Sequence, residues 1–218
     1  MIALEINTRS QKKGNRRPVL EILIHFADGS KKTFVQPDAE ISESILQQIN
    51  PSHLFAQTRI VVADDYSKSV YVCSQINRID FVNDGDGFAY IPNDHADIVE
   101  LTEAEFRKHV PLNHPSRLQK RRQRRRVGNL LVSFLNLRMR GGSQVYLMNE
   151  TLVKLPAESQ SYMQRLLSKA ALAIRLPGGG QSFLNLANLI GYTVYPGVRE
   201  VPSDTWMAQP RVAYETDN

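Results

Sequence analysis

The stretch from Phe106 to Asn149 contains no carboxylate, and this feature limits the possible folds of the chain more than any other. It holds eleven Lys and Arg residues. Cations this dense cannot be neutralised by their own neighbours, so the counter-charge has to come from elsewhere. Two sources are open: a polyanion such as RNA, DNA or an anionic lipid surface, and the acidic part of the same chain or of a second copy.

Charge is segregated along the rest of the chain as well. Residues 18–105 hold five basic and fifteen acidic residues, which gives this part a net charge of −10. Residues 1–17 hold five basic residues and one acidic residue, and residues 150–218 hold six of each kind. The acidic part of the chain therefore lies between two basic segments.

The densest cationic segment runs from Arg117 to Arg126 and has seven positive charges. Guanidinium groups bind phosphate in a bidentate manner and stack on bases, whereas the ammonium group of Lys acts more like a point charge. The segment resembles the arginine-rich peptides that bind structured RNA, and the resemblance implies phosphate binding without a defined specificity. A second basic cluster extends the interface if folding places it nearby. The predicted nucleic-acid-binding residues are Arg117, Lys120, Arg121, Arg122, Arg124, Arg125 and Arg126, with Lys12, Lys13, Arg16 and Arg17.

Three other interpretations of the cationic segment stay open. The first is that the segment is a solvated helix face or linker, as many charge runs are. The second is that it is an arm that lies on an acidic protein surface, which would make the chain a subunit or scaffold of a protein complex. The third is that it binds anionic lipid, because the apolar run Val127–Leu137 follows it directly. Few aromatic residues are interleaved with the basic ones, and Phe134 is expected in the core rather than as a platform on which bases stack. The sequence therefore gives no support for sequence-specific recognition of nucleic acid.

Composition predicts a stable globular protein, because 42% of the residues are hydrophobic and a chain of this size buries a real core. With Cys73 as the single cysteine, no intramolecular disulfide forms, which favours a reducing, cytoplasmic location. The longest apolar stretch is too short and too polar to span a bilayer. No transmembrane segment and no targeting segment is expected, and the sequence leaves the oligomeric state open.

Short apolar runs separated by turn residues predict an α+β fold of two small modules, each made of antiparallel hairpins with one or two helices. The predicted boundaries are an acidic, strand-rich module over residues 1–110, a basic helical linker over 111–142, and a second module over 143–218 with an extended C-terminal tail. The linker helix is expected to end near Leu131 and to precede a strand up to Arg140. Other helices are predicted over Ser42–Ile49 with Ser42 as cap, from Glu103 to about His109 with Thr102 as cap, and over Pro156–Ala171.

An ungapped alignment of Val70–Val82 with Phe183–Tyr195 indicates an internal repeat. Apolar residues coincide at several positions, such as Cys73 with Leu186 and Ile79 with Tyr192. The alignment predicts a duplicated α+β unit made of a helix, a hairpin and a closing strand. Any two buried strands joined by a short turn share part of this pattern, so the alternative of no duplication stays open.

No catalytic residue, metal ligand or cofactor site is predicted. The turn Gly178–Gly180 lacks the Lys of a phosphate-binding loop. Cys73 has no neighbouring base in the sequence pattern and is expected to be a buried, inert thiol. An acidic group that comprises Asp64, Asp65, Asp94, His95, Asp97 and Glu100 leaves a metal-dependent nuclease as a distant third hypothesis.

The sequence thus predicts a non-enzymatic nucleic-acid-binding or adaptor protein that uses its arginine-rich segment on phosphates. The alternative is a subunit of a protein complex whose basic arm engages an acidic partner surface.

Overall fold

The computed structural model describes residues 3–5, 20–64, 66–83, 98–110, 130–152, 158–195 and 206. These residues form a mixed α+β fold that consists mainly of strands, which confirms the predicted fold class at this level. None of the helices in this part of the chain is long and apolar enough to cross a bilayer.

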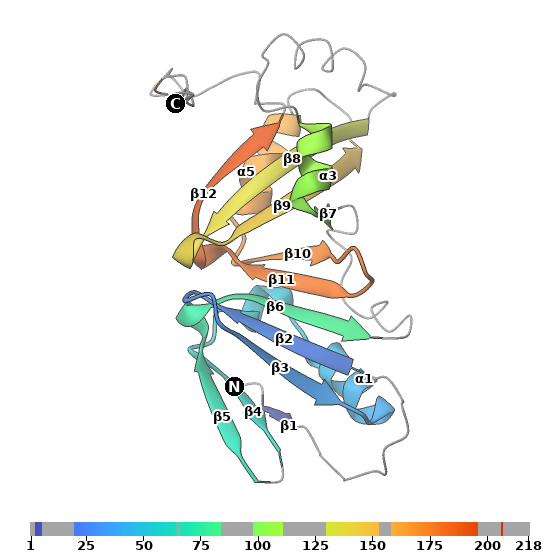
Figure 1. Ribbon diagram of the computed structural model, residues 1–218, viewed down its shortest axis with the longest axis vertical. Coiled ribbons are helices and arrows are strands. Elements are labelled where there is room, and N and C mark those ends of the chain that lie inside the picture. Colours follow the sequence, from blue (N-terminus) through green and yellow to red (C-terminus); the bar gives the residue numbers. More distant parts are fainter. Residues whose placement is uncertain are drawn as a thin grey trace, which may run out of the picture.

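The strands form two sheets. The larger has nine strands in the order β12-β8-β9-β7-β10-β11-β6-β2-β3, and the smaller has three in the order β1-β4-β5. The larger sheet runs along the long axis of the molecule (Figure 1). Its strands are β2 (Leu20–Phe26), β3 (Lys31–Gln36), β6 (Ile76–Asn83), β7 (Ile98–Leu101), β8 (Leu130–Met139), β9 (Gln144–Leu152), β10 (Ala171–Arg175), β11 (Gln181–Asn185) and β12 (Leu189–Tyr195). The smaller sheet consists of β1 (Ala3–Glu5), β4 (Arg59–Ala63) and β5 (Lys68–Val72).

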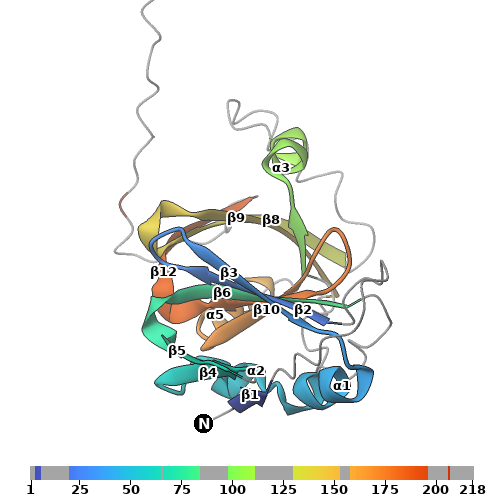
Figure 2. The ribbon, with the colours of Figure 1, turned by 60° about the horizontal axis from the view of Figure 1, so that its bottom comes forward.

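In the part of the chain that the structure describes, four α-helices and several short 3-10 turns connect these strands. Figure 2 shows α1 and the small sheet on one side of the large sheet, and α3 on the opposite side beyond β8 and β9. The helices are α1 (Ala39–Gln48), α2 (Pro51–Leu54), α3 (Glu103–His109) and α5 (Glu158–Leu167), and the 3-10 turns are η1 (Cys73–Gln75), η3 (Arg140–Gly142) and η4 (Leu186–Asn188).

Helix caps explain where two of the helices begin. The prediction for α3 is confirmed: the Thr102 hydroxyl accepts from the Glu105 amide and the Glu105 carboxylate accepts from the Thr102 amide, which completes a capping box. The predicted cap of α1 was wrong. Asp38 caps this helix by accepting from the amides of Glu40 and Ile41, while Ser42 lies inside the helix and is buried. The carboxylate reaches two free amides of the first turn, so the helix begins one turn earlier than predicted.

The same set of strand pairings occurs twice along the chain. β2, β3, β5 and β6 correspond to β8, β9, β11 and β12 at a spacing of 113 residues, and β4 corresponds to β10 at a spacing of 112. The β2–β3 hairpin turns at Gly29 and the β8–β9 hairpin turns at Gly142, and both glycines have a φ of 86°. Closing hydrogen bonds occur at matching positions, from the Phe26 amide to the Ser30 carbonyl and from the Met139 amide to the Ser143 carbonyl. The two hairpin turns are therefore closed by equivalent hydrogen bonds, with a glycine of positive φ at the same position.

The closing strands repeat this correspondence. β6 pairs antiparallel with β2, and β12 pairs antiparallel with β8. In each pair the register skips one residue, Asn77 in β6 and Ile190 in β12. A 3-10 turn precedes each closing strand, and its first amide donates to a matching carbonyl, Cys73 to Thr58 and Leu186 to Ala170. The alignment that indicated a repeat thus coincides with equivalent strand register.

The first strand of each set also has an equivalent neighbour. β1 pairs parallel with β4, and β7 pairs parallel with β10. We call β1 to β6 the first strand set and β7 to β12 the second strand set. The sets differ at one contact, because β7 also pairs with β9, whereas β1 and β3 do not pair in the described residues. Division into two modules with the predicted boundaries stays a prediction at this point.

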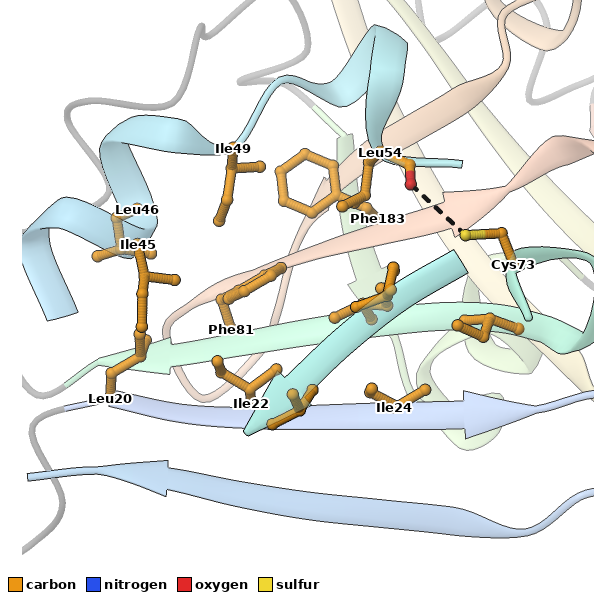
Figure 3. Close-up of a cluster of buried hydrophobic side chains, with 14 of the residues drawn as sticks. Leu20, Ile22, Ile24, Ile45, Leu46, Ile49, Leu54, Cys73, Phe81 and Phe183 are labelled. Carbon is orange, nitrogen blue, oxygen red and sulfur yellow. Dashed lines mark hydrogen bonds between the residues drawn. The ribbon is translucent and has the colours of Figure 1, made fainter. Parts of the chain in front are cut away.

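The apolar core follows the two strand sets. One cluster fills the space between β2, β6, α1 and the small sheet, as Figure 3 shows for Leu20, Ile22, Phe81 and their neighbours. A second lies between β8, β9, α5 and β10, and a third, smaller one surrounds Phe106 of α3. Phe106 packs edge-to-face against Phe134 with ring centroids 6.3 Å apart, and Phe134 is a core residue as expected.

Several other expectations can be compared with the described residues. The strand expected up to Arg140 is present as β8, and the best predicted helix is present as α5 with narrower bounds. β7 was not predicted. Most of the predicted linker helix and all of the predicted extended tail except Trp206 lie outside the described residues.

Candidate functional site

All eleven predicted nucleic-acid-binding residues lie outside the described residues. Their positions along the chain can still be related to the strands on either side. Lys12, Lys13, Arg16 and Arg17 lie in the connection from β1 to β2, and the segment Arg117–Arg126 lies in the connection from β7 to β8. Both basic segments therefore belong to the connection between the first and second strands of a set.

This shared location has a structural consequence. The strands that begin and end each connection pair in the same way, β1 with β4 and β7 with β10 on one side, β2 with β6 and β8 with β12 on the other. The strands on either side of each connection are therefore in equivalent places, although β7 also pairs with β9. The second connection is the longer one, because it includes α3 before the cationic segment.

Helix α3 fixes the beginning of the carboxylate-free stretch to the body of the protein. Phe106 is 1% exposed and packs against Phe134, Tyr146 and Tyr195. On the outer face, the guanidinium of Arg107 donates to the Glu103 carboxylate one turn earlier. The last acidic residues before the stretch thus stabilise α3 itself.

Carboxylates of the acidic part are used in local structure. The Asp28 carboxylate accepts from the Ser30 amide and hydroxyl in the β2–β3 turn, and these bonds lower its pKa. The Asp64 carboxylate holds the β4–β5 turn in the same way, by accepting from the amides of Tyr66 and Ser67, and its pKa is also lowered. Several carboxylates of residues 18–105 therefore accept hydrogen bonds that stabilise local structure.

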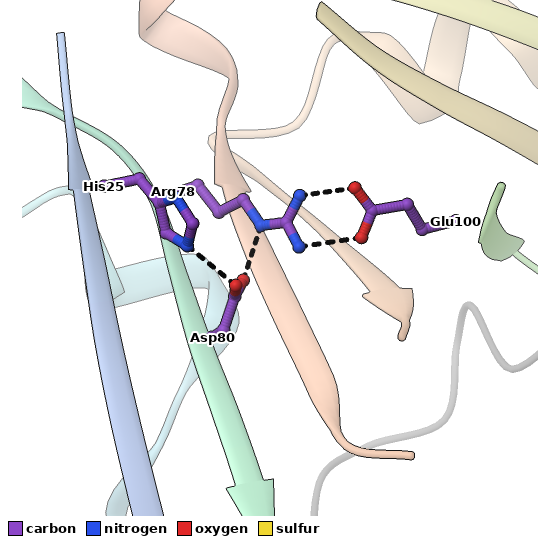
Figure 4. Close-up of polar contacts among 4 residues, drawn as sticks. All are labelled: His25, Arg78, Asp80 and Glu100. Carbon is purple, nitrogen blue, oxygen red and sulfur yellow. Dashed lines mark hydrogen bonds and ion pairs between the residues drawn. The ribbon is translucent and has the colours of Figure 1, made fainter. Parts of the chain in front are cut away.

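The main buried polar group of the described residues is a network around Arg78 of β6 (Figure 4). The guanidinium donates to both carboxylate oxygens of Glu100, at 2.6 and 2.7 Å, and also to Asp80. Asp80 in turn bonds the His25 ring at 2.8 Å. Glu100 lies on β7, so the network connects the first strand set with the second.

Burial and ion pairing have opposite effects on the pKa values in this network. Burial alone raises the pKa of Asp80, but the bonds with His25 and Arg78 outweigh it and the pKa is lowered. Burial alone lowers the pKa of Arg78, but the bidentate bond to Glu100 and the charge of Asp80 raise it. Both groups stay charged at neutral pH, so Arg78 and Asp80 form a structural ion pair.

Groups that could support catalysis have structural roles in the described residues. The Cys73 thiol is 2% exposed and burial raises its pKa, as expected for an inert thiol. Its sulfur lies 3.9 Å from the Leu54 carbonyl oxygen (Figure 3). Of the acidic group weighed as a nuclease site, Glu100 binds Arg78 and Asp64 holds a turn, while the other four residues lie outside the described part. Within that part no three His, Cys, Asp or Glu side chains are placed to hold a metal ion.

Amide side chains complete the junction between the two strand sets, where β6 of the first set pairs with β11 of the second. The Asn185 amide nitrogen donates to the carbonyls of Cys73 and Ile76, and that of Asn188 donates to the carbonyls of Ser74 and Ile76. The 3-10 turn η4 is thereby bonded to the 3-10 turn η1. Sequence reasoning missed this junction and the Arg78 network, although the repeat alignment had placed the two turns at matching positions.

Comparison of the chain with protein-family models, with curated proteins and with solved structures found no match.

Proposed function

We propose that the protein is a non-enzymatic nucleic-acid-binding protein or adaptor, built from a duplicated unit, that uses its two basic connections on phosphates. The observation that carries this proposal is the shared location of the basic segments. Both lie between the first and second strands of a strand set. A duplicated unit has equivalent connections at equivalent places in its chain order, so under this proposal each strand set contributes one basic segment to phosphate binding.

The distribution of negative charge supports an external ligand. Asp28, Asp64 and Asp80 are bonded to neighbouring groups in turns and in the Arg78 network. Of these three, Asp80 is paired with the Arg78 guanidinium, so its charge is offset within the network and is less available to the cations of the segment Arg117–Arg126.

Salt dependence is the measurement that tests this proposal. Binding of the full chain to fluorescent RNA, to duplex DNA and to anionic vesicles is measured side by side over a range of salt concentrations. If all seven cations of the segment contact duplex phosphates, the log-log slope of affinity against salt is about −6. Comparable binding to vesicles and nucleic acid would contradict a nucleic-acid function, and so would a slope near zero.

Matched variants separate the basic connections from general surface charge. Arg121, Arg122, Arg124 and Arg125 are changed together to Gln, and a second variant changes Lys12, Lys13, Arg16 and Arg17. The control removes the same amount of charge from exposed sites on the described surface, with Lys31, Lys32, Arg59 and Arg165 changed to Gln. We expect the first two variants to lose roughly three to four units of salt slope each, at about 0.9 per lost phosphate contact, and the control to lose much less.

The alternative function, a subunit of a protein complex, is favoured by exposed apolar side chains on two strands of the described surface, among them Val70 and Tyr192. A protein partner held by such a surface would stay bound to the variant of Arg121, Arg122, Arg124 and Arg125. Retention of a co-purifying protein together with loss of nucleic acid would show that the chain has both functions.

A further inference from the structure

The junction between the two strand sets joins β6 of the first set to β11 of the second. Ile79 lies opposite Phe183, and Asp80 lies opposite Ser182. By the 113-residue spacing, β11 corresponds to β5 and β6 corresponds to β12. The junction is therefore head-to-tail, because each set contributes a different edge. A contact of this kind leaves its two complementary edges unused at the ends of the pair.

Those complementary edges are β5 and β12. Among the described strands, β5 pairs only with β4 and β12 pairs only with β8. The two strands lie toward opposite ends of the molecule in Figure 1. Both carry exposed apolar side chains, which is unusual for a strand edge that stays in water. These are Val70 (47% exposed), Val72 (48%), Ile190 (61%) and Tyr192 (49%).

Corresponding positions in the internal junction are buried. Phe183, which corresponds to Val70, is 0% exposed, and Ile79, which corresponds to Tyr192, is 2% exposed. The same two positions of the repeated unit are thus apolar in both strand sets. Inside the chain they face each other and exclude water, and at the ends of the chain they are exposed.

We propose that β5 of one chain pairs antiparallel with β12 of a second copy, so that the internal junction is continued from chain to chain. This inference does not depend on nucleic-acid binding. Its register follows from the internal one by the 113-residue spacing. Opposite partners are Lys68 with Val194, Ser69 with Thr193, Val70 with Tyr192, and Tyr71 with Gly191.

Polar groups at these edges fit such a contact. Ser69 and Thr193 would take the places of Ser182 and Asp80, and two hydroxyls can share a cross-strand hydrogen bond without burying a charge. Gln75 corresponds to Asn188, whose amide bonds η4 to η1 inside the chain. Gln75 is exposed and offers the same kind of amide to the η4 carbonyls of the second copy.

Some parts of the internal junction cannot be repeated, and the contact between the hairpin turns is one of them. Gly141 has a φ of 78°, and a Cβ atom there would lie 1.7 Å from the Ala27 carbonyl oxygen. The corresponding residue in the first strand set is Asp28, which has a side chain and no positive φ. The hairpin turns of neighbouring copies therefore stay apart, and the strands alone hold the contact. We expect an association that is weaker than the internal junction and depends on concentration.

A head-to-tail contact repeated from copy to copy produces a ring if the rotation closes and a filament if it does not. The full chain is measured over a concentration series by native mass spectrometry and light scattering. We expect masses that are integral multiples of 24.7 kDa, with larger species at higher concentration. A mass of one chain at all concentrations would overturn the proposal.

Two single variants test the head-to-tail geometry. Val70→Lys blocks the β5 edge and Tyr192→Lys blocks the β12 edge, because a lysine on either edge disfavours strand pairing. Each variant alone is expected to have the mass of one chain. Mixed in equal amounts, they retain one intact β5 edge and one intact β12 edge, and we expect a complex of two chains and no larger species. Assembly retained by either variant alone would overturn the proposed contact, as would a mixture that stays at the mass of one chain.

A matched control and a cross-link complete the test. Val35→Lys places the same charge on a different exposed edge, that of β3 (Val35 is 46% exposed), and should leave the wild-type assembly unchanged. The double variant Val70→Cys with Tyr192→Cys should form a disulfide between chains, because directly opposite residues have the required separation. Val70→Cys with Ile190→Cys, which does not match the register, should form none. The cross-link decides the question even if a lysine variant fails to fold, since equal cross-linking of both pairs would contradict the register.

Discussion

β6 and β12 occupy the same place in the two strand sets, but their sequences suit different neighbours. β6 lies between β2 and β11 and carries Arg78 and Asp80. β12 pairs with β8 alone among the described strands and has Gly191 and Thr193 at the corresponding positions. The same strand of the repeated unit thus pairs with a further strand in one set and not in the other, and its charged residues occur where that further pairing is made. Arg78 of β6 binds Glu100 of β7 where the two strand sets meet. β12 has a glycine in place of this arginine and cannot make the same ion pair.

The largest effect should come from removing the cation of this network. Arg78→Met leaves the buried Asp80 and the partly buried Glu100 without the guanidinium, and breaking a buried ion pair costs roughly 3–5 kcal/mol. We expect the free energy of unfolding in urea to fall by an amount toward the upper end of that range, because two carboxylates are affected. Arg138→Met, at an exposed position of β8, is the control and should change it by less than about 0.5 kcal/mol. Equal losses in both variants would show that the network does not hold the strand sets together.

The apolar position shared by both strand sets should show the next largest contrast. Phe183→Ala removes a fully buried ring that packs on Phe81, with ring centroids 5.9 Å apart, and should cost about 3–5 kcal/mol. Val70→Ala at the corresponding position should cost less than about 0.5 kcal/mol in dilute solution, where β5 faces water. Chemical denaturation of the two variants at low protein concentration measures the difference. A large loss for Val70→Ala under these conditions would mean that β5 is already covered within one chain.

Local features of the fold could be predicted from the sequence where a few neighbouring residues determine them. The Asp28-Gly29 turn is an example, because a glycine at positive φ and a short polar side chain specify the hairpin without distant contacts. The capping box at Thr102 and Glu105 is another. In α1 the same reasoning selected Ser42, although Asp38 is the cap, because both residue types favour caps and the sequence alone does not show which amides are free.

Contacts between distant residues could not be predicted in the same way. Arg78 and Glu100 lie on different strands, with the residues that follow β6 between them. Strand β7 itself is short, and two β-branched residues are the main feature of its sequence that indicates a strand. The repeat alignment matched Cys73 with Leu186 and Ile79 with Tyr192, and the strand registers coincide with it. It could not show that β6 of one set pairs with β11 of the other, since an ungapped alignment compares positions and carries no information about which edges meet. The cationic residues, in contrast, were evident from composition, and their binding role stays a prediction.

The smallest contrast concerns two glycines of the hairpin turns. Gly29 and Gly141 both have positive φ, and alanine at such a position costs about 1–2 kcal/mol because the left-handed conformation is strained for residues with a side chain. No atom lies within 4 Å of a Cβ placed on Gly29, whereas a Cβ on Gly141 meets the Ala27 backbone. Gly141→Ala should therefore lower the free energy of unfolding by at least about 1 kcal/mol more than Gly29→Ala, because the two hairpin turns must also separate. Gly141 and Ala27 belong to different strand sets. The extra loss of unfolding free energy should therefore be accompanied by faster amide hydrogen exchange at the contact between η1 and η4. Equal losses in the two variants, with unchanged exchange at this contact, would show that the turns do not contribute to the junction.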